Sequence, residues 1–454
     1  MCSEFFRIPI SAGGVPIFGF GVLLLVWLAA TGWSIWGSAR QFGAAAAIQA
    51  HLPTLLIGAA VIVFLPRMFP DGVPIRGYGV MVVTGSAAGI ALAVRRAKQN
   101  GVDPDEIFGL AIAMFVAGIV GARLFFLIEY WDTNIRRSVP GSDAMDWGAT
   151  LREALSFTEG GLVVYGSLIG ALLAFGWYMR RRGLPMLAMA DLIAPSMAIG
   201  LAFGRIGCLL NGCCYGGETT APWAVTFPRE NAPGRTSPPY GVQAQHGRMY
   251  GLRLAGGGVD YGDNANDEAT DNGPPTVVAV DDGSAADNAG VQTGDAIAMI
   301  NGRATRTLDA AYDALFTAFV EHADVTLRTA GGATRRIAAV DPPPRSLPVH
   351  PTQIYSAVNA TLLFAVLWTF FPLRRRDGAV IALTLTLYPI ARFLLEIIRV
   401  DESAVFGTGL SISQNVSIAM LALAAGLWLW LWRQPPGELA LPLKSGEPSG
   451  GAAA

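Results

Sequence analysis

The chain has 454 residues, of which 52% are hydrophobic and only 15% are charged, and its mean hydropathy is +0.43. Soluble domains carry about 25% charged residues, so this composition excludes a soluble globular protein and indicates a membrane protein. The formal net charge of −2, without a basic cluster interleaved with aromatic side chains, predicts no nucleic acid partner. Four cysteines are too few for a disulfide-stabilised scaffold.

Nine apolar stretches each approach the roughly 20 residues that a helix needs to cross a bilayer. The second stretch is short, which leaves open whether it spans the membrane or only dips into it. No cleavable signal pattern precedes the first, which is therefore expected to remain in the protein. The predicted fold is a polytopic α-helical membrane protein. The stretches cover residues 16–36, 53–66, 77–94, 107–130, 160–179, 184–203, 355–372, 379–398 and 413–432.

Basic residues follow every second stretch from the third onward. They lie at 95–98, 180–182, 374–376 and Arg433. In an alternating topology these positions share one side, which the positive-inside rule assigns to the cytoplasm. The segment 217–349 then lies outside, and the tail 434–454 is expected to be flexible and cytoplasmic.

The outer segment has the composition of a small α+β domain. Residues 256–275 are rich in Gly, Asp and Asn and predict a flexible loop. Beyond the loop, strands are expected at 276–280, 294–300, 325–328 and 335–340, with a hairpin turn at Asn301-Gly302. Helices are expected at 285–290 and 308–319.

The run from Gly283 to Gly302 resembles a PDZ domain of the bacterial protease type, spanning about residues 250–340. PDZ domains bind an extended peptide, often a C-terminus, along a sheet edge. The resemblance places the carboxylate-binding loop earlier in the chain. It implies a partner peptide or protein C-terminus bound by Gly251, Leu252, Arg253 and Leu254. The simpler interpretation is that the domain only caps the membrane part.

Three arginines lie near the outer ends of the fourth, sixth and eighth stretches: Arg123, Arg205 and Arg392. Arg392 follows Ala379 by 13 residues, which is about 20 Å along a helix in a roughly 30 Å core, too deep for simple snorkelling. Arginines from three helices at the same depth in the membrane can together bind an anion such as a phospholipid phosphate.

Further polar residues accompany these arginines. Arg392, Glu396 and Arg399 share one helical face, and a structural interpretation is an internal Arg–Glu pair that joins helices. The third stretch begins with Tyr78. The seventh stretch begins with His350 and the polar residues that follow it up to residue 355. A lone histidine is more often a structural group than a catalyst.

The stretch 204–216 combines glycines with Arg205 and three thiols, Cys208, Cys213 and Cys214. Two of the thiols could form a disulfide in an oxidising compartment, or a nearby arginine could activate one as a nucleophile. The simplest interpretation is that they pack as small apolar groups. No metal site is predicted, because structural zinc sites need four well-spaced ligands.

With these motifs assembled, the chain resembles the prolipoprotein diacylglyceryl transferases from about residue 75 to 432, interrupted by the PDZ-like insertion. The resemblance divides the chain into extra membrane segments (1–74), a core in two parts (75–216 and 350–433), the insertion (217–349) and the tail (434–454). Its motifs are residues 121–123, 159–166, 191–195, 204–207 with 211–212, 350–355, and Arg392 with Glu396 and Arg399.

The resemblance implies transfer of the diacylglyceryl group of phosphatidylglycerol to the lipobox cysteine thiol of a prolipoprotein signal peptide, without a cofactor. The site would face the outer leaflet of the bacterial inner membrane, with the PDZ-like domain in the periplasm. Arginines would neutralise the phosphate of the leaving group. A polar residue would help to remove the proton of the thiol.

Roles carry over position by position. Arg205 and Arg392 match the essential arginines of the family, and Tyr165 stands where many members have a histidine proposed as the base. Cys208, Cys213 and Ser356 also depart from the common pattern, and these departures leave the general base open. The implied substrate-binding residues are Tyr78, Arg123, Asn211, Gly216, His350, Gln353, Tyr355, Glu396 and Arg399.

Two further hypotheses compete with this function. A divergent member of the family could transfer a phospholipid-derived group to another protein that the PDZ-like domain selects. A non-enzymatic protein could use the membrane segments only to display that domain, but this hypothesis leaves the three membrane arginines unexplained.

Overall fold

The computed structural model describes residues 3–131, 135–137, 145–155, 163–256, 274–399, 404–405, 408–435 and 439–441. The chain divides into two compact units, which we describe separately. Unit 1 comprises Met1–Met81, Ile206–Gly262 and Glu268–Pro351, and unit 2 comprises the rest. The predicted flexible loop at 256–275 lies almost wholly outside the described residues.

Eight helices in the described part of the chain are long and apolar enough to cross a membrane, which confirms a polytopic helical membrane protein. The fifth predicted stretch forms another long helix, α6 (Val164–Arg182), which ends in three arginines and is not among the eight. The eight are α1 (Val22–Phe42), α2 (Ala44–Met68), α3 (Gly77–Gln99), α4 (Pro104–Glu129), α7 (Met186–Asn211), α11 (Thr352–Phe370), α12 (Ala379–Ile398) and α13 (Ile412–Arg433).

The second stretch, for which spanning and dipping were both left open, forms a helix long enough to span the membrane. α2 has 25 residues and is long and apolar enough to span. The prediction began the segment at Pro53, but Pro53 lies inside the helix. Prolines are tolerated within membrane helices, so the alanine-rich run before Pro53 extends the helix toward its N-terminus.

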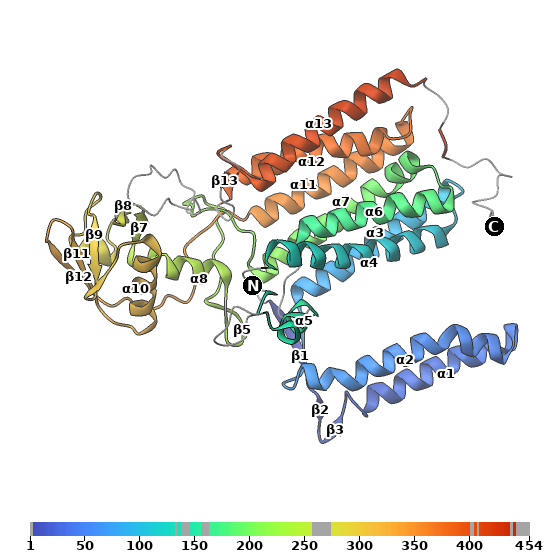
Figure 1. Ribbon diagram of the computed structural model, residues 1–454, viewed down its shortest axis with the longest axis horizontal. Helices are drawn as coiled ribbons and strands as arrows, with labels where there is room; N and C mark the ends of the chain where they lie inside the picture. The colour runs from blue at the N-terminus through green and yellow to red at the C-terminus, as the bar shows by residue number, and fades with distance from the viewer. Residues whose placement is uncertain are drawn as a thin grey trace. The chain divides into compact units, whose positions relative to one another are not determined.

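In unit 2, polar contacts join helix ends that the alternating topology predicts to lie together. The Arg96 guanidinium at the end of α3 lies over the Trp368 ring, 3.7 Å from its centroid, and donates to the Trp368 carbonyl near the end of α11. Arg182, which ends α6, forms an ion pair of 2.5 Å with Glu106 in the first turn of α4. Figure 1 shows these helices as one bundle with α7, α12 and α13.

Asp191 ties α7 to α12 at this same end of the bundle. Its fully buried carboxylate accepts hydrogen bonds from the Gly378 and Ile381 amides, each at 2.8 Å, and so caps the first turn of α12. Arg374 donates to the Leu441 carbonyl at 3.2 Å, and Leu441 is fully buried. The tail that was predicted to be flexible is therefore anchored at Leu441. Residues 442–454 lie outside the described part.

The N-terminal part of unit 1 is a helical hairpin of α1 and α2 next to small sheets (Figure 1). Strand β1 (Glu4–Ile8) pairs antiparallel with β4 (Val73–Arg76), and β2 (Ser11–Ala12) pairs with β3 (Val15–Pro16). The Gly77 amide, at the start of α3, donates to the Ser3 carbonyl at 2.9 Å. The segment just before α3 therefore lies beside the N-terminal residues of the chain.

The inserted part of unit 1 is an α+β domain with one apolar core, which extends from Tyr240 to Ile337. Every predicted strand and helix of this segment is present, and the Asn301-Gly302 turn has the positive φ angles of a hairpin turn, 48° and 77°. The sheet order is β10-β9-β11-β12, and β7 pairs with β8. The elements are α8 (Pro238–Gln245), β7 (Leu252–Ala255), β8 (Thr276–Val280), α9 (Ala285–Asn288), β9 (Ile297–Ile300), β10 (Arg303–Ala304), α10 (Leu308–Val320), β11 (Val325–Thr329) and β12 (Thr334–Ile337).

Two antiparallel connections lead into and out of this domain. Val225 pairs with Val349, and Pro228 with Arg345. The Arg229 amide donates to the Pro344 carbonyl at 2.9 Å, after which β5 (Glu230–Ala232) and β6 (Arg235–Thr236) form a small hairpin. The minor elements elsewhere are α5 (Trp147–Leu155), β13 (Ala404–Val405) and β14 (Leu410–Ser411).

Candidate functional site

A charged cluster on α12 brings together three of the predicted residues in unit 2. Arg392 Nη1 lies 2.5 Å from Glu396 Oε2, and Arg399 Nη1 lies 3.9 Å from the same oxygen. The Glu396 side chain is only 3% exposed. The predicted shared helical face and the predicted Arg–Glu pair are both observed. Two guanidinium groups around one carboxylate leave a net positive charge, which favours an anionic ligand.

The start of α13 completes this cluster. Arg392 Nη2 donates to Ser413 Oγ at 2.7 Å, and Ser411 Oγ donates to Glu396 Oε1 at 3.4 Å. Ser411 and Gln414 form a capping box, which fixes where α13 begins and therefore where Ser413 points. The sequence prediction missed both serines, although the Ser411-x-x-Gln414 pattern is a recognisable helix-start signal.

Arg123 is placed by a second group of helices. The residue is 6% exposed, and its guanidinium donates to the Glu153 carbonyl at 2.7 Å and to the Ala154 carbonyl at 3.0 Å. These carbonyls belong to the last turn of α5, where the ends of helices lack partners. Arg123 therefore holds α5 against α4. A direct role of Arg123 at the site stays a prediction.

Tyr165 lies beside a very close crossing of α4 and α6. A Cβ atom added at Gly166 would lie 2.3 Å from the Gly121 carbonyl oxygen, and one at Gly170 would lie 2.2 Å from the Ala117 carbonyl oxygen. Small residues of this kind let membrane helices approach at backbone distance. Arg123 and the half-buried Tyr165 flank the contact between Gly121 and Gly166, so this crossing sets the positions of both. The preceding motif residues 159–162 lie outside the described residues.

Arg205 differs from the other arginines of the predicted site. It is half-buried on α7, and its guanidinium forms no hydrogen bond or ion pair with any residue that the structure describes. A guanidinium in an apolar helix that binds none of the described residues is available to bind an anion.

Gln353 and Tyr355 lie in the first turn of α11, where Gln353 is fully buried and Tyr355 half-buried. They complete the predicted residues of unit 2. All other predicted site residues belong to unit 1, namely Tyr78, Asn211, Gly216, His350, the three cysteines and the peptide-binding residues 251–254.

Unit 1 brings several of these residues together near the end of α7. Tyr78 on α3 packs closely against Gly207, where an added Cβ would lie 3.0 Å from Tyr78 Cδ2. The Gly216 amide donates to the His350 carbonyl at 2.9 Å. The Asn211 carbonyl accepts from Asn231 Nδ2 at 2.9 Å. Asn231 is 5% exposed and was missed by the sequence prediction, since no motif includes it.

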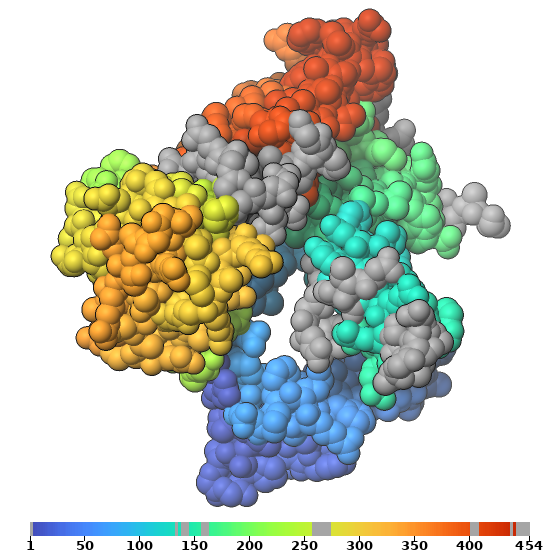
Figure 2. Space-filling model, turned by 60° about the vertical axis from the view of Figure 1, so that its left-hand side comes forward, coloured from blue at the N-terminus to red at the C-terminus, as the bar shows by residue number. Residues whose placement is uncertain are grey.

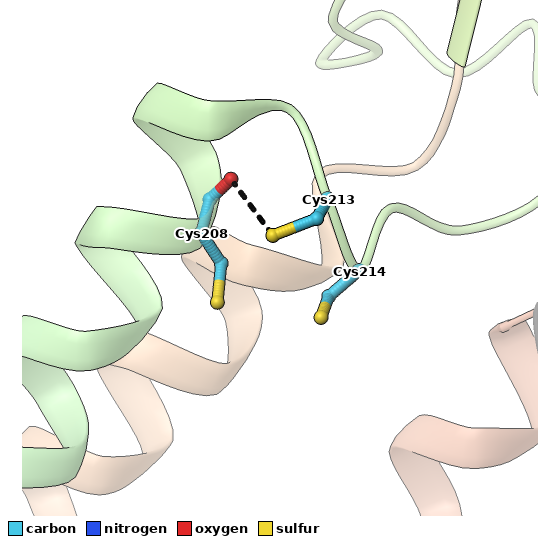
Figure 3. Close-up of side chains that lie close together, drawn as sticks. All are labelled: Cys208, Cys213 and Cys214. Atoms are coloured by element: carbon cyan, nitrogen blue, oxygen red, sulfur yellow. Dashed lines mark hydrogen bonds between the residues drawn. The ribbon is translucent and has the colours of Figure 1, made fainter. Parts of the chain in front are cut away.

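The three cysteines converge around the turn that ends α7. Their Sγ atoms all lie within 4.8 Å of one another, and all three side chains are half-buried (Figure 3). The hydrogen bond with Cys208 lowers the pKa of the Cys213 thiol, but the neighbouring Cys214 and burial together raise this pKa above its ordinary value. A raised pKa disfavours a spontaneous thiolate, and so weakens the hypothesis of a nucleophilic thiol activated by arginine.

In the inserted domain, the predicted carboxylate-binding residues are engaged by the chain itself. The Gly251 amide donates to the Arg248 carbonyl at 3.0 Å, and the Leu252 amide to the Gly247 carbonyl at 3.4 Å. Leu252 and Leu254 are buried in the core. A peptide carboxylate could accept from these amides only by replacing their present hydrogen bonds.

Polar contacts also secure this strand from outside. Arg253 pairs with Glu218 at 3.4 Å, and the Tyr312 hydroxyl of α10 donates to the Leu254 carbonyl at 3.2 Å. The His246 ring stacks on Tyr312 with their centroids 4.5 Å apart. Peptide binding at this edge stays a prediction.

Together, the fold and these clusters define a multi-pass helical membrane protein with cationic groups set in its helices. The family model for prolipoprotein diacylglyceryl transferase matches residues 66–278 and 283–431. A phosphatidylglycerol–prolipoprotein diacylglyceryl transferase of Rhodopirellula baltica is 34% identical over 449 residues, covering 91% of this chain and 85% of that protein. The chain therefore belongs to the prolipoprotein diacylglyceryl transferase family, and it is a transferase.

Two other relatives match a smaller part of the chain. The enzyme of the same name from Clostridium tetani is 35% identical over 156 residues, which cover 34% of this chain and 57% of that protein. One from Clostridium perfringens is 33% identical over 172 residues, which cover 38% of this chain and 62% of that protein.

Proposed function

We propose that this protein transfers the diacylglyceryl group of phosphatidylglycerol to the thiol of a lipobox cysteine in a prolipoprotein signal peptide. The observation that carries the proposal is the half-buried Arg205, whose guanidinium binds no described residue. The chain that carries it belongs to the transferase family. The net positive cluster of Arg392, Glu396 and Arg399 supports it. Both features suit the phosphate of an anionic phospholipid.

In this reaction the substrate thiolate attacks the diacylglyceryl carbon that is bonded to the phosphate oxygen. The carbon–oxygen bond breaks, a thioether forms and glycerol phosphate leaves with the bonding electrons. Negative charge grows on the leaving phosphate, so Arg205 and Arg392 would stabilise the transition state. Arg392 is held by Glu396 and Ser413 before any substrate binds, so little reorganisation is needed. Among the predicted site residues, Tyr165 would be the candidate for the general base.

The proposed location is the outer leaflet of the bacterial inner membrane. The basic clusters at Arg95–Lys98, 180–182 and 374–376 lie at helix ends that share one side, and the positive-inside rule makes that side cytoplasmic. Arg205 and Arg392 lie toward the opposite ends of their helices. The inserted domain would then be periplasmic.

The test is transfer from labelled phosphatidylglycerol to a lipobox peptide by the purified protein, measured by mass spectrometry. We expect a diacylglyceryl thioether, a loss of about 100-fold or more in Arg205→Ala, and full activity in Arg433→Ala, a control arginine at the other end of the bundle. Equal activity of Arg205→Ala and the unaltered protein would refute the role of Arg205. A different mass increment would favour transfer of another phospholipid-derived group.

We further propose that the inserted domain is a PDZ-like module that selects the protein partner rather than performing the transfer. The motif at 283–302 and the observed strand and helix order support this assignment. Its core starts at Tyr240, so removal of residues 256–340 alone would expose Leu252 and Leu254.

A cleaner excision is available at the two connections. The Ser237 amide donates to the Arg229 carbonyl, and the Arg229 amide donates to the Pro344 carbonyl, both at 2.9 Å. Residues 238–343 can therefore be replaced by a short Gly-Ser linker. We expect this variant to modify a short lipobox peptide but to lose preference among full-length acceptors. A folded variant with no activity on the peptide would place the domain in catalysis.

A further inference from the structure

The three cysteines form a cluster that the proposed transfer does not use. Cys208 lies in the last turn of α7, and its carbonyl accepts from the Gly212 amide at 2.9 Å and the Cys213 amide at 3.1 Å. These bonds fold the chain back across the helix end. Figure 3 shows that the turn brings the Cys213 and Cys214 side chains to the same side as Cys208.

The backbone conformation of Cys214 indicates that its side chain has a function, because a glycine would adopt this conformation at lower cost. Its φ is 58°, in the left-handed region that glycine adopts at lower cost than any other residue. Gly212, two positions earlier, occupies the same region with φ of 79°. Strained non-glycine positions tend to gather at functional sites. Here the strained position completes a group of three thiols within 4.8 Å of one another.

We propose that Cys208, Cys213 and Cys214 bind one Zn²⁺ ion as three thiolates and leave its fourth position for the acceptor thiol. Zinc with sulfur ligands has Zn–S bonds of about 2.3 Å in a tetrahedron, which places sulfur atoms roughly 3.8 Å apart. The observed sulfurs need to approach by at most about 1 Å to reach this geometry. Sites with three protein ligands and one open position are typical of catalytic zinc.

The half-burial of all three thiols agrees with an open fourth position, since an exogenous ligand must reach the ion. The sequence predicted no metal because structural zinc sites need four well-spaced ligands and this stretch offers three thiols. The turn after Asn211 brings those three thiols together, which suits a site with one open position. Thiolate ligands also favour Zn²⁺ over the hard cations Mg²⁺ and Ca²⁺.

This inference rests on the proposed function and deepens it. A thiol bound to zinc is deprotonated, so the ion would release the acceptor proton to solvent and hold the thiolate. The thiolate then attacks the diacylglyceryl carbon, the bond to the phosphate oxygen breaks, and the thioether leaves the ion, which keeps its three ligands. Such a site explains how the chain works with Tyr165 in place of a stronger base. Cys208 follows Arg205 by three residues on one helix, so both face the same side of α7.

The first experiment measures metal content in the full-length protein, purified in detergent under reducing conditions. We expect about one zinc per chain by elemental mass spectrometry, lost in Cys208→Ser, Cys213→Ser and Cys214→Ser. Absence of zinc from the unaltered protein, after incubation with zinc, would overturn the proposal without reliance on any variant. So would a Cys–Cys disulfide, detected as the loss of two hydrogens, in place of bound metal.

The second experiment tests the open position without turnover. Co²⁺ replaces the zinc, and its thiolate charge-transfer absorption is recorded with a lipobox peptide but no phospholipid. We expect absorption to rise by about one third, from three thiolates to four, and to stay constant with a peptide that carries Ser at the lipobox position. A bound metal that ignores the peptide thiol would overturn the activation step.

Arg205→Ala separates this inference from the proposed function. It should lose transfer but keep the cobalt response, because it removes only the proposed phosphate ligand. Loss of the cobalt response in a folded Arg205→Ala protein would overturn the separate role of the thiol cluster.

Discussion

The crossing of α4 and α6 offers a sharp test of how the fold positions the site. In Gly166→Ala, the new Cβ would lie 2.3 Å from the Gly121 carbonyl oxygen, where such contacts essentially never fall below 3.0 Å. The helices must separate locally by at least about 0.7 Å. Overpacking of this kind costs about 1–3 kcal/mol of stability. Because Arg123 and Tyr165 flank the contact, we expect transfer to fall by about 10- to 100-fold.

The matched control lies on the same helix. Gly176 has no atom within 4 Å of an added Cβ, so Gly176→Ala should keep full activity and a thermal midpoint equal to or above that of the unaltered protein. Both variants are assayed in detergent for transfer and for thermal unfolding. The reasoning is wrong if Gly166→Ala matches the unaltered protein in both assays, or if Gly176→Ala is equally impaired.

Three further predictions concern charged groups. Glu396→Gln leaves Arg392 without its buried carboxylate and should destabilise the protein by about 3 kcal/mol, measured as a lower thermal midpoint. Glu218→Gln removes the main partner of Arg248, which is 10% exposed, and should raise amide exchange in β7, with a loss of about 1–3 kcal/mol. Burial lowers the pKa of His246, so its contribution is intact above about pH 6.5 and is lost as the pH falls through its folded-state pKa. Acidification should therefore increase amide exchange in α10, and His246→Gln should remove this pH dependence.

Controls for these variants come from the same chain. The Glu321 side chain has no hydrogen bond or ion pair with any described residue, so Glu321→Gln should leave both stability and exchange unchanged. If Glu218→Gln behaves like Glu321→Gln, the Arg248 ion pair does not stabilise the domain. If acid increases exchange equally in His246→Gln, another group causes the pH dependence.

Hydropathy predicted the membrane helices but not their ends. The third stretch was predicted to end at Val94, whereas α3 continues to Gln99 through Arg95, Arg96 and Lys98. Hydropathy marks where the apolar face ends, but long basic side chains favour helix and can extend beyond the hydrocarbon. Helix ends set by contacts between helices, such as the Asp191 carboxylate at Gly378, have no local signal.

The inserted domain shows the same division between local and distant information. Its strands, helices and the Asn301-Gly302 turn were predictable because each has a local pattern. The contribution of α8 was not predicted, because Tyr240 and Ala244 occur in a short segment without clear periodicity. They are buried only because α10 supplies an apolar face for them.

The candidate site was predictable to the extent that helix periodicity places its residues. The spacing of Arg392 and Glu396 gave their ion pair, since residues four apart on a helix face one another. The partnership of Arg392 with Ser413 depends on how α12 packs on α13, which no local pattern encodes. The convergence of the thiols depends on the turn after α7.

Arg392 and Arg205 differ in a way that matters for the proposed chemistry. Glu396 partly neutralises Arg392, which weakens its attraction for a phosphate but fixes its guanidinium in position. Arg205 has no described partner, so it keeps its full charge but must be ordered by the ligand. Affinity for the lipid should therefore depend more on Arg205, while stabilisation of the leaving phosphate should depend more on the pre-ordered Arg392. A site that needed only charge would not retain a buried carboxylate beside one of its two arginines.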